Sequence, residues 1–262
     1  MKKVILYISV GIAVLGSSCK KYLDINANPN EATSGTPETV LPQAIVYTAT
    51  SINAFNTYGS QLVGYSANAG GFGGFGTSVT YGFSSSTFSG LWTTSYDVLN
   101  DFEYVIQQTD TIADYGYFNG AARIMKALNF QLLVDAYNDV PYREALKGVD
   151  ELTPVYDKAE DIYADLAKQL DDAITIIKNT EEREHASSTS NVKALQTGTD
   201  PMFHGDMMLW KQLANTIKLR LIVRAHGKAN FANTTFDEAG FLEEDAIINP
   251  GYTRDNGKQN PA

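Results

Sequence analysis

FQLLVDAYNDVPYREAL, residues 130–146, is an apolar helical run followed by a polar pair, a proline and a short segment that leaves the turn. Pro141 has no backbone N–H group, and a proline moves the residue before it out of the helical region. We therefore expect a helix that ends near Asn138. Taken alone, this stretch requires no more than a helix end and a turn, so its meaning depends on the rest of the chain.

Apolar residues recur at three- and four-residue steps in five segments, which is the spacing of a buried helix face. These segments are residues 37–55, 87–108, 118–137, 157–178 and 206–225. Pro37 suits a first helical turn, and Asp206 is a suitable N-cap for the last helix. Residues 180–199 are polar and rich in Ser and Thr, so we expect a loop there. The sequence predicts an all-α fold of helical hairpins joined by long loops.

The N-terminus has the order of a secretory signal. Lys2 and Lys3 precede an apolar run at residues 4–15, which is shorter than the roughly 20 residues that a membrane-spanning helix needs. Small residues then lead into Cys19, an arrangement similar to a bacterial lipobox. That resemblance implies cleavage before Cys19 and acylation of this residue. The alternative is an ordinary signal peptide with an incidental cysteine.

Residues 64–83 hold seven glycines interleaved with aromatic residues. Glycine at this density opposes a helix through its backbone entropy, so we expect a long loop. No spacing within it matches the GxGxxG pattern of a nucleotide-binding turn. Aromatic rings stack on the apolar faces of sugars, and amides bind sugar hydroxyls. The candidate ligand-binding residues are therefore Tyr65, Asn68, Phe72, Phe75 and Tyr81. Alternatively, these rings pack against the helices and hold the loop in place.

Composition argues against several classes of function. The net charge of −10 argues against a nucleic-acid surface, which needs clustered Lys and Arg. A single cysteine excludes an intramolecular disulfide and any metal site built from several cysteines. His204 and Asp206 would supply two metal ligands, but no third is evident. We expect no metal and no cofactor.

Signs of catalysis are also missing from the sequence. It contains neither a GxSxG nor an HExxH motif. The visible acidic pairs are Asp171-Asp172, Glu181-Glu182 and Glu243-Glu244. We expect them on solvated helix faces or loops, because adjacent residues of a helix do not face each other across a cleft. Paired carboxylates from distant positions would still permit glycoside hydrolysis, so a surface hydrolase remains an alternative.

Five stretches together resemble the SusD/RagB family of surface lipoproteins. They are CKKYLDINANPN (19–30), LWTTSYDVL (91–99), and residues 122–146, 155–174 and 200–225. The third and fifth are the most specific, and the five occur in the order of the family. The resemblance implies a SusD-like helical fold with hairpins similar to tetratricopeptide repeats. Small residues Ala121, Ala122 and Ala127 would allow neighbouring helices to approach closely.

The same resemblance implies a function and a location. Members capture nutrients, often glycans, without cleaving them and deliver them to a SusC-like TonB-dependent transporter in the outer membrane. We therefore expect a lipid-anchored protein at the cell surface that binds a glycan or a peptide and no nucleic acid. A helical-repeat lipoprotein that acts only as a scaffold for other proteins is the alternative from another class.

The expected organisation has three parts. Residues 1–18 are a signal peptide, residues 19–36 a lipidated tether, and residues 37–262 a SusD-like helical domain. Members of the family continue well beyond this point, so we expect this domain to be the N-terminal part of a longer one.

Overall fold

The computed structural model describes residues 35–66, 76–186 and 189–249. The chain divides into two units, Met1–Gly35 and Thr36–Ala262. The first unit lies outside the described residues except for Gly35, and the fold is that of the second unit. Its elements, in chain order, are α2 (Pro37–Leu62), α3 (Thr77–Thr80), α4 (Ser89–Thr109), η2 (Ala113–Tyr115), α5 (Gly116–Tyr137), β1 (Val140–Pro141), η3 (Gly148–Asp150), β2 (Tyr156–Asp157), α6 (Ala159–Ala186) and α7 (Met207–Ala225).

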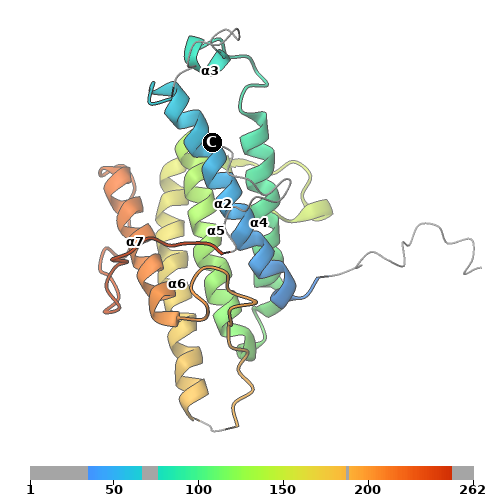
Figure 1. Cartoon of the computed structure of the whole chain (residues 1–262), viewed down its shortest axis with the longest axis vertical. Coiled ribbons are helices and arrows are strands. Elements are labelled where there is room, and N and C mark those ends of the chain that lie inside the picture. Colours follow the sequence, from blue (N-terminus) through green and yellow to red (C-terminus); the bar gives the residue numbers. More distant parts are fainter. Residues whose placement is uncertain (1–34, 67–75, 187–188, 250–262) are drawn as a thin grey trace, which may run out of the picture. The chain divides into compact units, whose positions relative to one another are not determined.

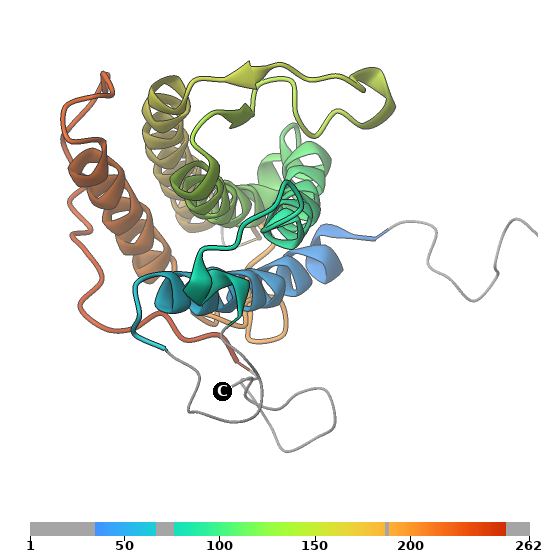
Figure 2. The same ribbon diagram turned by 90° about the horizontal axis from the view of Figure 1, so that it is seen from above.

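The central helix of this unit is α5. It packs against α2, α4, α6 and α7, and Figures 1 and 2 show it between α4 and α6. Most of its residues are buried, among them Phe118, Ile124 and Phe130. The prediction of an all-α fold is confirmed, because the two strands are only two residues long each.

The quoted stretch ends a helix as predicted. Tyr137 is the last residue of α5. Asn138 follows with a φ of 66° and a ψ of −108°, a backbone conformation that does not occur inside a helix. Val140 and Pro141 then form β1, which pairs antiparallel with Tyr156 and Asp157 of β2. This pairing brings residue 156 back to the end of α5.

Helix beginnings also follow the sequence. Pro37 is the first residue of α2, where Thr36 and Thr39 form a reciprocal capping box. The carboxylate of Asp206 accepts hydrogen bonds from the backbone N–H groups of Met208 and Leu209 at the start of α7. Within the described part of the predicted 64–83 loop, residues 77–80 form the short helix α3.

The predicted loop at residues 180–199 is wrong in its first part, because α6 runs on to Ala186. Tertiary contacts favour the helix there. Thr180 is buried over Gly116, and the carboxylates of Glu181 and Glu184 bind Lys211 and Tyr117 from other helices. Local polarity thus indicates a loop only where no neighbouring helix supplies partners.

Within the described ranges, none of the helices combines the length and the apolarity that crossing a bilayer requires.

Candidate ligand-binding site

The predicted ligand residues are only partly described. Asn68, Phe72 and Phe75 lie outside the described residues, as does the predicted lipidation site Cys19. Tyr65 is 90% exposed and Tyr81 is 63% exposed. The Tyr81 hydroxyl donates a hydrogen bond to the carbonyl of Leu62, with 2.6 Å between the oxygens. Tyr81 therefore fastens the segment after α3 to the end of α2 while much of its ring faces solvent.

Tyr81 is the first of four rings that touch one another in series. Its ring centroid lies 5.8 Å from that of Phe83, which lies 5.5 Å from that of Phe88. Phe88 in turn meets Tyr58 of α2 edge to face at 5.0 Å. These are favourable separations for aromatic pairs. Phe83 remains 45% exposed, so this series presents rings to solvent as well as holding the segment in place.

A second aromatic group surrounds Trp92 in the first turn of α4. Its ring lies 5.1 Å from both Tyr96 and Tyr137 and is stacked on Tyr156 at 6.1 Å and 26°. Tyr156 belongs to β2 and is 64% exposed. Burial raises the pKa of Tyr96, as do nearby Tyr156 and Asp157, so its hydroxyl stays protonated. That hydroxyl donates a hydrogen bond of 2.7 Å to the carbonyl of Pro141 in β1. The bond holds β1, the strand that pairs with β2, against α4.

The two groups are joined and form one feature. The Tyr137 hydroxyl donates a hydrogen bond of 2.5 Å to the carbonyl of Phe88. We call the eight rings the aromatic surface; they are Tyr58, Tyr81, Phe83, Phe88, Trp92, Tyr96, Tyr137 and Tyr156. Rings that are apolar on their faces and polar at one end suit a ligand that alternates C–H and hydroxyl groups.

Sequence reasoning included Tyr81 of this surface and missed the other seven rings as ligand contacts. Trp92 carried a signal, because a tryptophan in the first turn of a helix beside a glycine-rich loop is well placed for ligand binding. Tyr156 carried none, since only the pairing of β1 with β2 brings it to Trp92.

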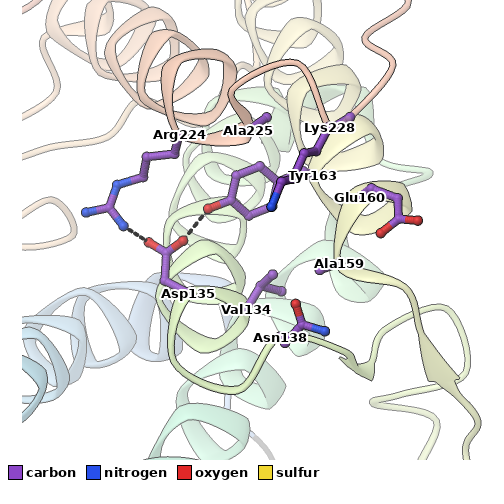
Figure 3. A pocket seen from close by; sticks show the side chains of 10 residues that line it. Val134, Asp135, Asn138, Ala159, Glu160, Tyr163, Arg224, Ala225 and Lys228 are labelled. Carbon is purple, nitrogen blue, oxygen red and sulfur yellow. Dashed lines mark hydrogen bonds and ion pairs between the residues drawn. The ribbon is translucent and has the colours of Figure 1, made fainter.

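A pocket of about 210 Å³ lies where the end of α5, the start of α6 and the end of α7 meet. Its polar wall is formed by Asp135, Asn138, Glu160, Tyr163, Arg224 and Lys228 (Figure 3). Alanines at positions 159, 225 and 229 form much of the apolar wall. Of the residues predicted from sequence to bind ligand, the two that the structure describes, Tyr65 and Tyr81, do not line this pocket.

Asp135 organises the polar wall. Its carboxylate accepts a hydrogen bond from the Tyr163 hydroxyl and forms an ion pair with Arg224 (Figure 3). Burial raises the pKa of Tyr163 to about 12, and the hydrogen bond to Asp135 acts in the same direction. Tyr163 is therefore a neutral donor at physiological pH, and it fixes the carboxylate together with Arg224.

The acidic pairs are not all solvated, contrary to expectation. Asp171 accepts two hydrogen bonds of 2.8 Å from Lys218, whose side chain is fully buried. Glu181 similarly holds Lys211 of α7. These carboxylates face a neighbouring helix because each neutralises a buried lysine, and their role is structural.

No metal site emerges in the described part of the chain, where no three His, Cys, Asp or Glu side chains converge. The Nδ1 atom of His204 lies 3.2 Å from the carbonyl oxygen of Asp200, while the nearby Asp206 carboxylate caps α7. Both predicted metal-ligand candidates thus have local structural partners.

Comparison with known families gives one match over most of the chain. The profile SusD-like_2, described as "Starch-binding associating with outer membrane", matches residues 29–249. A comparison with curated proteins gave no significant match.

Solved structures show the same likeness. A SusD/RagB family protein from Bacteroides thetaiotaomicron is 25% identical, with a TM-score of 0.62 over 76% of this chain and 40% of its own. A SusD homolog from Bacteroides fragilis is 17% identical, with a TM-score of 0.58 over 87% of this chain and 46% of its own. A SusD homolog from Bacteroides vulgatus is 19% identical, with a TM-score of 0.51 over 64% of this chain and 34% of its own. The chain thus spans less than half the length of these relatives.

Proposed function

This chain belongs to the SusD-like family, and from that premise we propose that it is a nutrient-binding lipoprotein of the outer membrane that captures glycans. The family description, starch binding in association with the outer membrane, supports both the ligand class and the location. The proposal also includes related oligomers, such as peptides, as ligands. Binding without cleavage accords with that description, and in the described residues Asp171 and Glu181 are each engaged by a lysine.

The aromatic surface is the observation that carries the proposal. Its exposed members, Tyr81, Phe83 and Tyr156, are rings that a sugar can stack on. Phe88 supports Phe83, which in turn contacts Tyr81, and Trp92 supports Tyr156. Because the rings come from α2, α4, α5, β2 and the segment between α3 and α4, and touch one another, they are already ordered before ligand binds. Preorganisation of this kind lowers the entropic cost of binding.

The proposal includes a lipid anchor and a partner. Acylation at Cys19, after removal of residues 1–18, would leave residues 19–36 as a tether for the helical domain that starts at residue 37. Each buried CH₂ of an acyl chain contributes about 0.8 kcal/mol to membrane binding. The anchor keeps the binder beside a SusC-like TonB-dependent transporter, so that captured ligand is passed on at high effective concentration.

Calorimetric titration of residues 20–262 with maltooligosaccharides, chitin oligosaccharides and peptides tests the capture of nutrients. We expect saturable binding of at least one glycan, with the glycan recovered intact. The double variant Tyr81→Ala, Phe83→Ala should weaken binding about tenfold or more, since each stacked ring contributes roughly 0.5–1.5 kcal/mol beyond its buried area. Tyr47→Ala, which removes an exposed tyrosine of α2 outside the aromatic surface, is the matched control.

Three other outcomes would change the conclusion. Binding that the double variant leaves intact would move the site away from the aromatic surface and keep the function. Failure of all ligands to bind would favour the protein scaffold. Cleaved glycan in the recovered material would favour a hydrolase.

A further inference from the structure

A groove of about 470 Å³ lies between α2 and α4, which pack side by side (Figure 1). Its polar lining consists of Tyr47 and Thr50 of α2 and of Thr94, Asp97, Asn100 and Asp101 of α4. None of these six side chains forms a hydrogen bond or an ion pair with another described residue. The pocket beside Asp135 differs, because Tyr163 and Arg224 already engage that carboxylate. The polar groups of the α2–α4 groove are therefore available to a ligand.

The groove carries two negative charges and no positive charge. Asp97 and Asp101 are four residues apart on α4, so their side chains are neighbours on one side of the helix. Neither α2 nor α4 contains a Lys, Arg or His residue. In the whole chain from residue 22 to residue 122 there is none either. A cation for these two carboxylates has to come from elsewhere.

The other carboxylates of this part of the chain all have partners. Glu38 accepts a hydrogen bond of 2.5 Å from the Tyr115 hydroxyl. The remaining three form ion pairs with cations of α5 and α6, and these pairs are Glu103–Lys126, Asp110–Arg123 and Asp114–Arg183. Among the described carboxylates before α5, only the two in the groove are thus left without a partner.

The free pair is unfavourable in the unliganded protein. Like charges four residues apart destabilise a helix. Asp101 is also partly buried, and burial raises its pKa, as does the charge of Asp97. A bound cation would relieve both effects. The energetics of the pair therefore agree with its geometry in favouring a positively charged ligand.

The rest of the lining suits a sugar. Pockets for small ligands measure roughly 300–1,000 Å³, so a volume of about 470 Å³ admits a small saccharide. Tyr47 is 48% exposed and offers a ring face to the C–H groups of such a ligand. The hydroxyls of Thr50 and Thr94 and the amide of Asn100 both donate and accept hydrogen bonds, as sugar hydroxyls do. A lysine side chain would use the carboxylates alone, whereas an amino sugar uses the whole lining.

We propose that the groove between α2 and α4 binds amino sugar residues, whose ammonium group is held by Asp97 and Asp101 while Tyr47 stacks on the ring. The inference rests on the proposed capture of glycans and adds a second site, specific for glycans with free amino groups. Neutral glycans have no group for the two carboxylates, so they bind at the aromatic surface and not in this groove.

Calorimetric titration of the Tyr81→Ala, Phe83→Ala variant isolates the groove, because this variant lacks two exposed rings of the aromatic surface. The ligands are the trisaccharide of glucosamine and its fully N-acetylated form, which differ in the charge of their amino groups. At about pH 6, where amines are protonated, we expect saturable binding of the glucosamine trisaccharide. The acetylated form should bind at least about tenfold more weakly, since it cannot form charge-assisted hydrogen bonds.

Asp101→Asn, added to the same variant, should weaken binding of the glucosamine trisaccharide about tenfold or more. Glu182→Gln is the matched control, because it removes one exposed carboxylate of α6 that does not line the groove, and it should leave the affinity unchanged.

Thermal unfolding of Asp101→Asn in the otherwise unaltered protein provides a second readout. We expect an unchanged or raised midpoint, because burial and Asp97 both disfavour the charge that this change removes. A lowered midpoint would show that the carboxylate has a structural role, and it would overturn the inference.

Equal affinities for the two trisaccharides would overturn the inference, as would an unchanged affinity in Asp101→Asn. Trilysine that binds as tightly as the glucosamine trisaccharide would overturn the choice of a sugar. If the unaltered protein binds neutral oligosaccharides but not the glucosamine trisaccharide, the amino-sugar site alone is refuted. Failure with every glycan would refute the proposed function as well.

Discussion

Gly120 of α5 lies directly against Ile177 of α6. A Cβ atom built on Gly120 would be 2.6 Å from Cγ1 of Ile177 and 3.3 Å from the backbone oxygen of Ala173. No side chain fits at the first of these distances without displacing the neighbour. One turn earlier, a Cβ on Gly116 would be 1.9 Å from Oγ1 of Thr180. Glycine at these two positions therefore sets how closely the two helices approach.

Gly120→Ala should destabilise the protein by about 1–3 kcal/mol, because overpacking a well-filled interior forces side chains or backbone to move. Urea unfolding followed by circular dichroism measures the change. Gly90→Ala is the matched control, since a Cβ there meets nothing within 4 Å. A loss in Gly120→Ala no greater than that in Gly90→Ala would contradict the close-contact explanation.

Lys218 is fully buried and depends on Asp171. Its ammonium group donates to both carboxylate oxygens at 2.8 Å and to the carbonyl of Thr235 at 2.7 Å. Asp171→Ala should cost about 3–5 kcal/mol of unfolding free energy, because it leaves a buried charge without its counter-ion. Lys218→Met should cost less, since it removes the buried charge itself. Chemical denaturation of both variants checks this order, and the reverse order would contradict the claim that Lys218 without Asp171 is a costly buried charge.

Asp237 should contribute a pH-dependent part of stability. Partial burial raises its pKa, but hydrogen bonds from Lys178 and from the N–H of Ala239 outweigh burial, and the pKa lies below its ordinary value of 3.8. A lowered pKa in the folded state stabilises the protein above pH 3.8, and this stabilisation is lost as the pH falls through the folded-state pKa.

Asp237→Asn should therefore be less stable than the parent at neutral pH, and the difference should shrink below about pH 4. Denaturant midpoints of both proteins, measured from neutral to acid pH, provide the comparison. A difference that stays constant as the pH falls would exclude the ionised carboxylate as its source.

Asn138 has a backbone conformation that side chains rarely adopt. At a φ of 66° and a ψ of −108° a glycine would be less strained. Asn138→Gly should keep the fold and raise the free energy of unfolding by up to about 1 kcal/mol. Asn138→Val should lower it, since a β-branched residue opposes this conformation. Thermal unfolding of the pair tests the sign, and equal effects would mean that the backbone relaxes at this position.

Helices whose faces are marked by regular apolar spacing were predictable from sequence, and so was the end of α5. Pro141 made Asn138 a boundary, and Asp206 marked the start of α7. These features are local, because the physical cause lies within a few residues of the effect. The last turns of α6 were not predictable, since Thr180 and Glu181 are held in a helix by Gly116 and Lys211 of other helices.

The candidate sites were less accessible to sequence analysis than the fold. Tyr81 stood out through its glycine-rich surroundings, whereas Tyr156 reaches Trp92 only because β1 pairs with β2. The pocket beside Asp135 draws on three helices, because this residue of α5 contacts Tyr163 of α6 and Arg224 of α7. Relationships between residues so distant in the chain leave no periodic signal.

The central place of α5 also bears on how the chain acquires its structure. Its partners α4 and α6 are its neighbours along the chain, and α2 packs against both α4 and α5. The α4–α5 contacts require only the short connection of residues 110–115 to close, which favours their early formation. We therefore expect the α4–α5 hairpin to form early, and α7, the last helix of the described part to be synthesised, to complete the pocket through Arg224.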